Sequence, residues 1–405
     1  MILFLQVLLS AVQVILLVGL LYYYSLLVAG SIPSQAISPD ITVKAAYDYK
    51  FAILIPAHNE ELVIGRTVTQ LTRQTYREHL FDIYVAADHC QDKTAKVAQE
   101  AGAIALERHE LPRGRKAYPL KWLLQHVLNS TRDYKAVVIF DADSQVDPNF
   151  LAEMATGLEK GYLAMQGQHV ISNPKDAVFS QLAAIDMRLN NLLRNQAKSN
   201  LKLSSRLMGD AMCFDADLVR SLGWGGDSLI EDREFEIHLL LAGERVHYIP
   251  DAISYGQASS QWGDASKQRM RWYSGVMELQ RAYLIPLLGK YLRTLNTAVL
   301  DRAIELLLPA YSWLSILTVI LLFIQAVTTP AIQLLLPLPV TFLAVLGWIL
   351  LPIIALAATK APGWYYRAFL YAPIYLVWRL GQSISVILKG GNVPWVRTKR
   401  REEKV

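Results

Sequence analysis

The sequence predicts an α/β protein with a mostly parallel sheet in its middle and membrane helices at both ends. Between about residues 48 and 280, short apolar segments alternate with stretches of helical pattern. Such alternation favours a parallel sheet that helices cover on both faces. Long uncharged apolar runs occur only outside this region. We therefore expect one water-soluble α/β domain between membrane segments.

The elements of the expected sheet are placed by their apolar runs. Strands are expected at 51–56, 81–87, 103–106 and 136–140, and helices at 60–75, 93–101 and 119–129. Polar residues follow three of the strands, among them Asn59, Asp88 and the pair Asp141 and Asp143. Ligands bind beyond the carboxyl ends of the strands in open α/β sheets, so these residues are expected to share one site.

Residues 1–30 are expected to form a membrane helix. Residues 2–29 carry no charge and are long enough to cross a bilayer. A secretory signal is the alternative, but the run lacks a basic start and is longer than a typical signal core. Two further spans are expected within residues 303–390, at 306–327 and 338–358.

The segments beside these spans leave alternatives open. Residues 281–297 are expected to form an amphipathic helix at the membrane surface, with a core-packing helix as the alternative. Residues 364–388 carry two arginines and a proline, and they fit either a third span or an interfacial or re-entrant segment. The basic tail 391–405 predicts a cytoplasmic end, which favours the interfacial placement and a multi-pass cell-membrane protein whose domain 48–280 is cytoplasmic.

The composition disfavours several classes of protein. The formal net charge of the 405 residues is +5, which is too diffuse to indicate nucleic-acid binding. The two cysteines, Cys90 and Cys213, are far apart, so neither a disulfide framework nor a structural zinc site is expected. No GxGxxG or Walker loop follows an expected strand, which disfavours dinucleotide enzymes and P-loop NTPases.

Asp141 and Asp143 indicate a cation site. Two carboxylates this close disfavour each other's ionised form, so a positive charge is expected nearby. Their oxygens suit Mg²⁺ or Mn²⁺, and such a cation would hold a diphosphate and neutralise its charge as a leaving group. A turn or a helix cap is the alternative, since Asp-x-Asp alone is a common pattern.

Five motifs occur in a fixed order over residues 50–280. They are FAILIPAHNEE at 51–61, ADHCQDKTA at 87–95, DAD at 141–143, EDREFEIHLLLAGERVHYIPDA from Glu231, and QRMRW at 268–272. Together with the membrane plan, this set resembles the membrane-bound family-2 glycosyltransferases, which include cellulose, chitin and hyaluronan synthases and ceramide glucosyltransferase. The resemblance implies a GT-A-like fold that binds a nucleotide-sugar and transfers its sugar.

The resemblance assigns the donor end of the site to three carboxylates. Asp141 and Asp143 would take the metal, Mg or Mn, and the diphosphate of a UDP-sugar. Asp88 would accept hydrogen bonds from uracil or ribose. Many relatives have two adjacent aspartates where this chain has Ala87 before Asp88, which leaves the detail of the base contacts open.

The resemblance also places basic residues near the donor phosphates. Lys116 matches the family's basic position, although the arginines within 113–115 could fill it. Gln268, Arg271 and Trp272 form the Gln-x-x-Arg-Trp motif, and their spacing would put them on one face of a helix. Arg271 would bind the diphosphate and Trp272 would line the acceptor pocket. An amphipathic helix with packed side chains is the alternative.

The acceptor end is assigned to the second acidic motif. Asp232 would be the general base, positioned by Glu231, because the family's motif puts an aspartate beside the acceptor hydroxyl. The alternative is a helix start, where acidic residues interact favourably with the helix dipole. Segment 208–212 resembles the one that shapes the acceptor pocket. Three scattered histidines are expected to be surface or loop residues: His58, His89 and His169.

These assignments predict an inverting transferase that moves a sugar from a UDP-sugar to a hydroxyl acceptor. A growing polysaccharide is slightly preferred as the acceptor, because the Gln-x-x-Arg-Trp motif is common in relatives that extend polysaccharides. A lipid acceptor entering from the bilayer is the close alternative, since the few spans leave little room for a pore. A non-catalytic membrane scaffold with the same fold is the alternative from another class.

Overall fold

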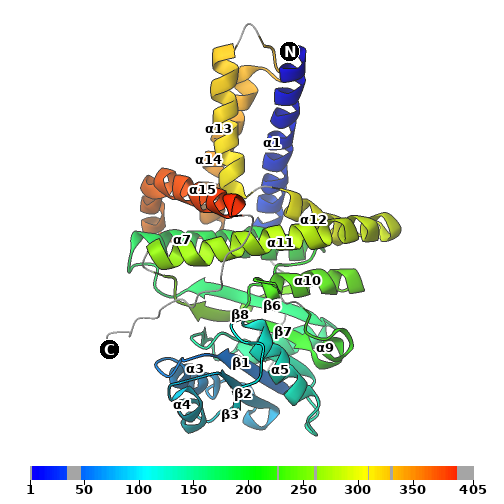
Figure 1. The fold of residues 1–405 in the computed structure, drawn as a ribbon, viewed down its shortest axis with the longest axis vertical. Helices are drawn as coiled ribbons and strands as arrows, with labels where there is room; N and C mark the ends of the chain where they lie inside the picture. Colours follow the sequence, from blue (N-terminus) through cyan, green and yellow to red (C-terminus); the bar gives the residue numbers. More distant parts are fainter. Residues whose placement is uncertain are drawn as a thin grey trace.

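The computed structural model describes residues 2–33, 47–225, 228–259, 262–308, 310–328 and 332–389. Within these ranges a sheet domain lies below an upright bundle of apolar helices, and a layer of helices lies between the two (Figure 1). The predicted basic tail 391–405 lies outside the described residues.

One eight-stranded sheet forms the lower domain, and its strand order is β3-β2-β1-β4-β7-β6-β8-β5. The strands are β1 (Phe51–Ala57), β2 (Phe81–Asp88), β3 (Ile104–Arg108), β4 (Ala136–Ile139), β5 (Gln145–Val146), β6 (Ala164–Ile171), β7 (Met212–Asp215) and β8 (His247–Gly256). Strands β1, β2, β3 and β4 run parallel to one another, and β6 runs parallel to β8. Strand β7 is antiparallel to both β4 and β6, and β5 is antiparallel to β8. The predicted mostly parallel α/β fold is confirmed.

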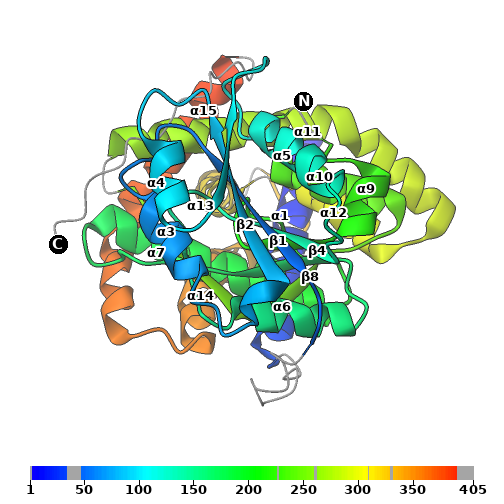
Figure 2. The ribbon, with the colours of Figure 1, turned by 90° about the horizontal axis from the view of Figure 1, so that it is seen from below.

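Helices cover both faces of the sheet because side chains of the strands alternate between them. Phe51, Ile53 and Ile55 pack in one core against the first set of helices, whereas Ala52 and Leu54 pack in the other core. The first face is covered by α3 (Ile64–Leu71), α4 (Thr94–Glu100) and α6 (Phe150–Glu159), and the second by α5 (Ala117–Leu128), α9 (Ala216–Leu222) and α10 (Glu231–Ala242). Figure 2 shows these layers from below.

The register of the parallel strands brings their carboxyl ends to one edge. Ala57 of β1 pairs with Ala87 of β2, and Leu54 of β1 pairs with Ile139 of β4. The loops that follow β1, β2 and β4 therefore leave the sheet side by side. Strand order changes direction at β1, and this is the position where open α/β sheets bind ligands.

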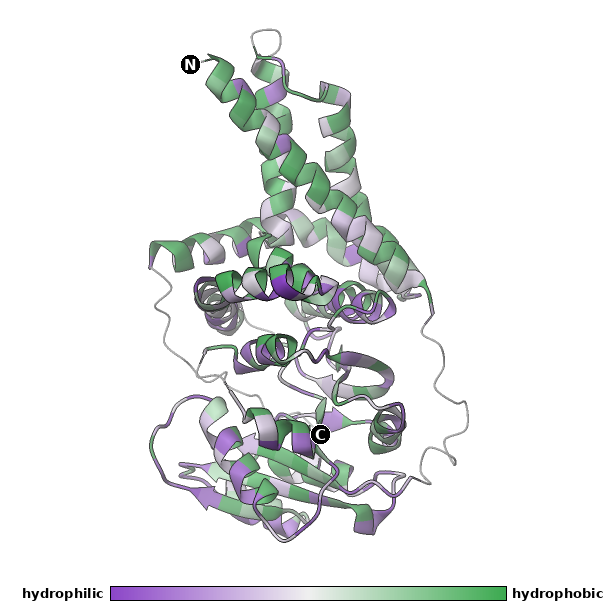
Figure 3. Ribbon diagram, turned by 90° about the vertical axis from the view of Figure 1, so that its right-hand side faces the viewer, coloured by the Kyte–Doolittle hydropathy of each residue, from purple (hydrophilic) through white to green (hydrophobic). Residues whose placement is uncertain are grey.

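In the part of the chain that the structure describes, three helices are long and apolar enough to cross a membrane: α1 (Ile2–Ser31), α13 (Tyr311–Thr328) and α14 (Leu338–Ala358). They form the upright bundle, whose apolar colouring contrasts with the mixed colouring of the sheet domain (Figure 3). Leu16, Leu20, Leu314 and Trp348 pack in its interior. The apolar composition of α1 thus fits the predicted membrane helix at 1–30, and that of α13 and α14 fits the predicted spans at 306–327 and 338–358.

The remaining helices lie across the base of the bundle (Figure 1). They are α7 (Val178–Leu189), η2 (Asn190–Gln196), α8 (Ala197–Asn200), α11 (Trp262–Thr294), α12 (Thr297–Leu307) and α15 (Ala372–Leu388). Two short helical turns, η1 (Glu78–Leu80) and η3 (Gly363–Tyr371), complete the described elements. The orientation of α15 across the bundle favours the interfacial placement of residues 364–388 over a span.

Candidate active site

A cavity of about 1800 Å³ begins at the carboxyl edge of the sheet and continues up between the helices at the base of the apolar bundle. Its lower wall comes from the loops after β1, β2 and β4, and its upper wall from α7, α11, α13, α14 and α15. Eight of the residues that the sequence predicts for the site line this cavity: Asp88, Lys116, Asp141, Asp143, Asp232, Gln268, Arg271 and Trp272. Residues that lie far apart in the sequence, from Asp88 to Trp272, thus meet in one place.

Asp88 lies at the end of β2 and is held by a buried arginine. The Arg108 Nη1 donates to Asp88 Oδ1 at 2.5 Å, and both side chains are less than a tenth exposed. His89 Nδ1 lies 2.9 Å from the same oxygen, and His58 Nδ1 lies 2.6 Å from the Asp88 carbonyl oxygen. The carboxylate of Asp88 is therefore fixed in position, and Arg108 balances its charge. Its other oxygen, Oδ2, is available at the cavity wall.

Lys116 supplies the positive charge beside the aspartate pair. Its Nζ donates to Asp141 Oδ1 and to the Gly209 carbonyl oxygen, both at 2.5 Å. Burial acts to lower the pKa of Lys116, but the charges of Asp141 and Glu231 outweigh it and raise the pKa. The ammonium group stays protonated and connects the end of β4 to the segment that precedes β7.

Asp210 organises the loop that carries the aspartate pair. Its Oδ1 accepts the Asp141 backbone N–H at 3.0 Å and the Ser144 hydroxyl at 2.6 Å. Its Oδ2 accepts the Ser254 hydroxyl at 2.7 Å and lies 2.9 Å from His169 Nδ1. Burial opposes ionisation, but the hydrogen bond and charge of His169 outweigh it and hold the pKa of Asp210 below its usual range. Asp210 is thus a buried carboxylate whose bonds fix the backbone at Asp141.

Glu231 and Asp232 begin α10 at the inner wall of the cavity. An added Cβ on Gly209 would lie 3.5 Å from Asp232 Oδ2 and 3.8 Å from Lys116 Nζ, so this carboxylate and this ammonium face the same small space. Burial raises the pKa of Asp232. Burial and the charge of Asp232 raise the pKa of Glu231 to about 7. Asp232 lines the cavity while Glu231 lies behind it, so Asp232 is the carboxylate that can reach a bound molecule.

The Gln-x-x-Arg-Trp motif lies on α11 and presents one face to the cavity. Gln268, Arg271 and Trp272 all line it, as their spacing on a helix predicts. Arg269 lines the cavity as well and donates to Asp186 of α7 at 2.8 Å, while its guanidinium lies 5.1 Å from the Trp272 ring centroid. The ion pair and the stacking hold the motif helix in one orientation.

The aspartate pair fits a divalent cation of the magnesium type. The Asp141 side chain is 44% exposed towards the cavity, and both carboxylates line it with hard oxygen ligands. Among the described residues, no group of three or more His, Cys, Asp or Glu side chains gathers to form a complete cage. Mg²⁺ and similar ions bind through one or two carboxylates plus substrate phosphates, so this open arrangement suits a cation that arrives with a diphosphate.

The structure also shows polar groups that the motifs do not single out. Arg108 and Asp210 hold predicted residues in place although they lie 20 and 69 positions from their partners. The prediction that His169 is a surface or loop residue is wrong, because it lies on β6 and contacts Asp210 and Ser254. Charge complementarity inside a folded site is not visible as local spacing. No sequence signal marks Arg108, and the resemblance of segment 208–212 to an acceptor-pocket segment assigns no role to Asp210.

The cavity lining becomes more apolar towards the bundle formed by α1, α13 and α14. Its upper wall is built mainly from apolar side chains of α13, α14 and α15, among them Leu317, Ile320, Ile349, Ile353 and Leu376. The carboxylates and Lys116 lie at the lower end, whereas the walls from α13, α14 and α15 are mainly apolar with a few polar side chains such as Tyr375, Arg379 and Ser383, and the two ends are continuous. A molecule with a polar head and an apolar tail matches this gradient.

The chain matches two family models. Residues 136–380 match "Glycosyl transferase family group 2", and residues 52–215 match "Glycosyl transferase family 2". The first match extends from β4 through the site and into α15, so it covers the aspartate pair, the second acidic motif and the Gln-x-x-Arg-Trp motif.

Curated relatives are distant but have consistent names. The chain is 23% identical over 236 residues to the probable glycosyltransferase YdaM of Bacillus subtilis (strain 168), covering 56% of this chain and 55% of that protein. It is 25% identical over 235 residues to the beta-monoglucosyldiacylglycerol synthase of Trichormus variabilis, covering 55% of this chain and 48% of that protein. The chain thus spans about half the length of these relatives.

A solved structure shares the fold over nearly the whole chain. The mannosyltransferase PcManGT from Pyrobaculum calidifontis, in complex with GDP-Man and Mn²⁺, superposes with a TM-score of 0.60 at 19% identity. The superposition covers 93% of this chain and 99% of that one. This likeness shows that the sheet domain and the helices attached to it form a GT-A-like fold.

Proposed function

The chain belongs to glycosyl transferase family group 2, and from this premise we propose that it transfers a sugar from a nucleoside diphosphate sugar to the hydroxyl of a membrane lipid. A UDP-sugar is the first donor to test. A divalent cation, Mg²⁺ or Mn²⁺, is the proposed cofactor. The Mn²⁺ and the nucleotide-sugar bound by the distant mannosyltransferase support a site of this kind.

The observation that carries the lipid acceptor is the continuity of the cavity from the carboxylates to the apolar membrane-side helices. A polysaccharide has hydroxyl groups along its whole length, and each needs a hydrogen-bond partner when it is buried. The leucine and isoleucine side chains of α13, α14 and α15 offer none, whereas they suit an acyl chain. The cavity therefore favours the lipid alternative over a growing polysaccharide.

The donor end would hold the nucleotide and its diphosphate. Asp88, fixed by Arg108, would accept hydrogen bonds from the base or the ribose. Asp141 and Asp143 would hold the cation, which when bound neutralises charge on the diphosphate as it leaves. Lys116 and Arg271 would donate to the phosphate oxygens from opposite walls of the cavity.

The chemical step would be a direct displacement. The acceptor oxygen forms a bond to the anomeric carbon of the sugar while the bond from that carbon to the diphosphate oxygen breaks. Asp232 takes the proton of the acceptor hydroxyl, and its raised pKa makes it a stronger base than an ordinary aspartate. One base and no covalent nucleophile give inversion at the anomeric carbon. Gln268 and Trp272 would hold the acceptor against this base.

We also propose that α1, α13 and α14 span the cell membrane and that the sheet domain lies on its cytoplasmic side. The apolar length of the three helices supports the spans, and the basic composition of the tail 391–405 supports the side. Since the carboxylates that transfer requires all line one cavity, a non-catalytic scaffold is disfavoured.

The test uses the full chain purified in detergent with Mn²⁺ and bacterial lipid extract. UDP-glucose, UDP-N-acetylglucosamine and GDP-mannose are supplied in turn, nucleoside diphosphate release is measured, and products are identified by mass spectrometry. Asp232→Asn should lower the rate about 10²–10⁴-fold, whereas Asp251→Asn, at an exposed position of β8, should leave it unchanged. Polymer ladders in place of a single glycolipid would contradict the lipid acceptor.

A further inference from the structure

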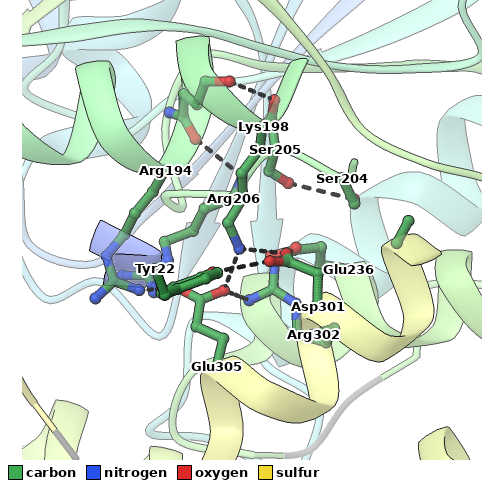
Figure 4. Close-up of polar contacts among 12 residues, drawn as sticks. Tyr22, Arg194, Lys198, Ser204, Ser205, Arg206, Glu236, Asp301, Arg302 and Glu305 are labelled. Carbon is green, nitrogen blue, oxygen red and sulfur yellow. Dashed lines mark hydrogen bonds and ion pairs between the residues drawn. The ribbon is translucent and has the colours of Figure 1, made fainter. Parts of the chain in front are cut away.

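A cluster of buried charges lies where the membrane bundle, α10 and α12 meet. Figure 4 shows Lys198 and Arg302 among three carboxylates. The Lys198 Nζ lies 2.8 Å from Asp301 and 2.6 Å from Glu305, and its side chain is fully buried. Arg302 pairs with Glu236 and with Glu305. These two cations contact one oxygen of each of the three carboxylates.

Three arginines on the cavity side of this cluster have few partners left. Arg194 and Arg206 both approach a single oxygen, Oε1 of Glu305. Arg233, next to the proposed base, also lines the cavity. Within the described residues, the Nε atoms of Arg206 and Arg233 are buried and have no hydrogen-bond partner. A guanidinium carries five N–H donors, so most of the donors in this group are unused by the protein.

The charges of the cluster do not balance. Five cations, Arg194, Lys198, Arg206, Arg233 and Arg302, face three carboxylates, Glu236, Asp301 and Glu305, so two positive charges are in excess. One positive charge remains in excess when the carboxylate of Asp232 is counted as well. Burial and the charge of Arg194 lower the pKa of Arg233 to about 10, so it stays protonated at neutral pH while it repels its neighbour. Cations that repel each other beside a cavity are stabilised by an anion.

We propose that Arg194, Arg206 and Arg233 bind the phosphate of the lipid acceptor, a site distinct from the one that holds the donor diphosphate. The donor end has its own cations, since Lys116 pairs with Asp141 and Arg271 lines the same cavity. The arginine group instead lies beside Tyr23 of α1, whose hydroxyl accepts from Arg194 at 3.0 Å. Basic pockets at the ends of membrane helices are suited to anionic lipid head groups.

This inference rests on the proposed function, because it names the head group of the acceptor that the transferase would use. An acceptor would place its phosphate on the arginines, its hydroxyl beside Asp232 and its acyl chains between α13, α14 and α15. Arg233 directly follows Asp232, so phosphate binding and hydroxyl placement would depend on the same first turn of α10. A neutral lipid would lack the first of these contacts.

The test compares two short-chain lipids that both carry a free hydroxyl: dioctanoyl phosphatidylglycerol, which has a phosphate, and dioctanoylglycerol, which has none. Binding to the full chain in a neutral detergent is measured without donor by native mass spectrometry or tryptophan fluorescence. The wild-type protein should bind the phosphatidylglycerol at least about tenfold more tightly, the size of one lost charged hydrogen bond. Equal binding of both lipids would overturn the proposal.

Variants locate the site. Arg206→Gln and Arg233→Gln should each reduce the preference for phosphatidylglycerol about tenfold, with the affinity for the donor nucleotide unchanged. Arg233→Lys keeps the charge and should keep most of the preference, which separates anion binding from packing. Arg220→Gln is the matched control, since Arg220 lies on α9 and pairs with Asp217 outside the cavity. Weaker donor binding in Arg206→Gln and Arg233→Gln, with the lipid preference intact, would place these arginines in the donor site and refute the inference.

Two further comparisons complete the test. One distinguishes a lipid phosphate from a free phosphate, and the other tests the phosphate site separately from the proposed function. Glycerol phosphate, the head group without acyl chains, should bind much more weakly than the lipid, and equal binding would refute a lipid site. If sugar is transferred to lipid but the wild-type protein does not prefer phosphatidylglycerol, the proposed function stands and the phosphate site fails. If the preference is present but no sugar reaches any lipid, the site stands and the proposed function fails.

Discussion

Asp210→Asn is the substitution that most directly tests how the site is built. The carboxylate of Asp210 is 2% exposed and accepts two hydrogen bonds on each oxygen, one of them from the backbone N–H of Asp141. Asparagine has the same shape but only one oxygen, and its NH₂ group can only donate. Two of the four donors around this position would therefore face another donor, and the negative charge that faces His169 would be lost.

The size of the effect follows from these contacts. Hydrogen bonds to a charged group contribute about 1.5–3 kcal/mol each, and two are lost. The Ser254 hydroxyl can turn and accept, which recovers part of this loss, so the expected destabilisation is about 2–4 kcal/mol. For a domain of this size each kcal/mol lowers the melting temperature by about 2–4 °C, which predicts a decrease of roughly 5–15 °C. A freed Asp141 backbone should also raise the cation concentration for half-maximal activity about 10–100-fold.

Two measurements check this prediction on the purified full chain. A thermal unfolding curve gives the melting temperature, and a Mn²⁺ titration of nucleoside diphosphate release gives the half-maximal concentration. Asp251→Asn, at an exposed position of the same sheet, is the control and should change neither. If Asp210→Asn melts like the control and needs no additional Mn²⁺, Asp210 does not hold the aspartate pair and the reasoning is wrong.

Three more predictions follow from the same geometry. Because the pKa of Glu231 is raised to about 7 and that of Asp232 is also raised, kcat/KM should fall as the pH drops below about 7, and a rate unchanged down to pH 5 would contradict this. Glu231 holds its proton more tightly in the folded protein than in the unfolded one, so protonation favours the folded state. The free energy of unfolding that this contributes is present in acid and is lost as the pH rises from 4.5 to about 7. Gly209→Ala and Gly161→Ala both force alanine to a φ of +79° and should each cost roughly 1–2 kcal/mol. Only Gly209→Ala should also lower kcat/KM, since its Cβ enters the site while nothing lies within 4 Å of the other. Lys198→Met should destabilise the protein by about 3–5 kcal/mol in a thermal unfolding assay, because among the described residues it leaves the buried Asp301 without an ion-pair partner, and an unchanged melting temperature would show that this pair is not ionised.

The first half of the sheet could be predicted from sequence because its strands are short apolar runs that alternate with helices. β1, β2 and β4 begin and end within two residues of the expected strands. The strands beyond Ile139 are harder to predict, because β5 has two residues and β6 carries polar side chains such as Gln166 and His169. Their place in the sheet is decided by tertiary pairing, and local periodicity does not report it.

The residues of the site also fall into two groups, those that could be predicted from sequence and those that could not. The carboxylates at the strand ends could be predicted, since each directly follows an apolar run and belongs to an ordered motif. Arg108 and His169 could not, because they are recognisable only through their partners, and the resemblance of segment 208–212 to an acceptor-pocket segment does not reveal the bond between Asp210 and Asp141. Arg194 and Arg206 are likewise isolated in sequence, Arg233 lies within the second acidic motif, and only the fold brings the three to one wall of the cavity.

The buried charge cluster gives a physical reason for the place of the base relative to the membrane. Tyr22 of α1 donates to Asp301 at 2.8 Å, Asp301 pairs with Lys198, and Arg302 joins the cluster to Glu236 of α10. Glu236 lies one helical turn after Asp232. Separating α1 from α10 would leave charges unpaired in a buried region, at a cost of several kcal/mol. The cluster therefore holds Asp232, the proposed base, at a fixed height below α1, α13 and α14, which is the placement that the proposed lipid acceptor requires.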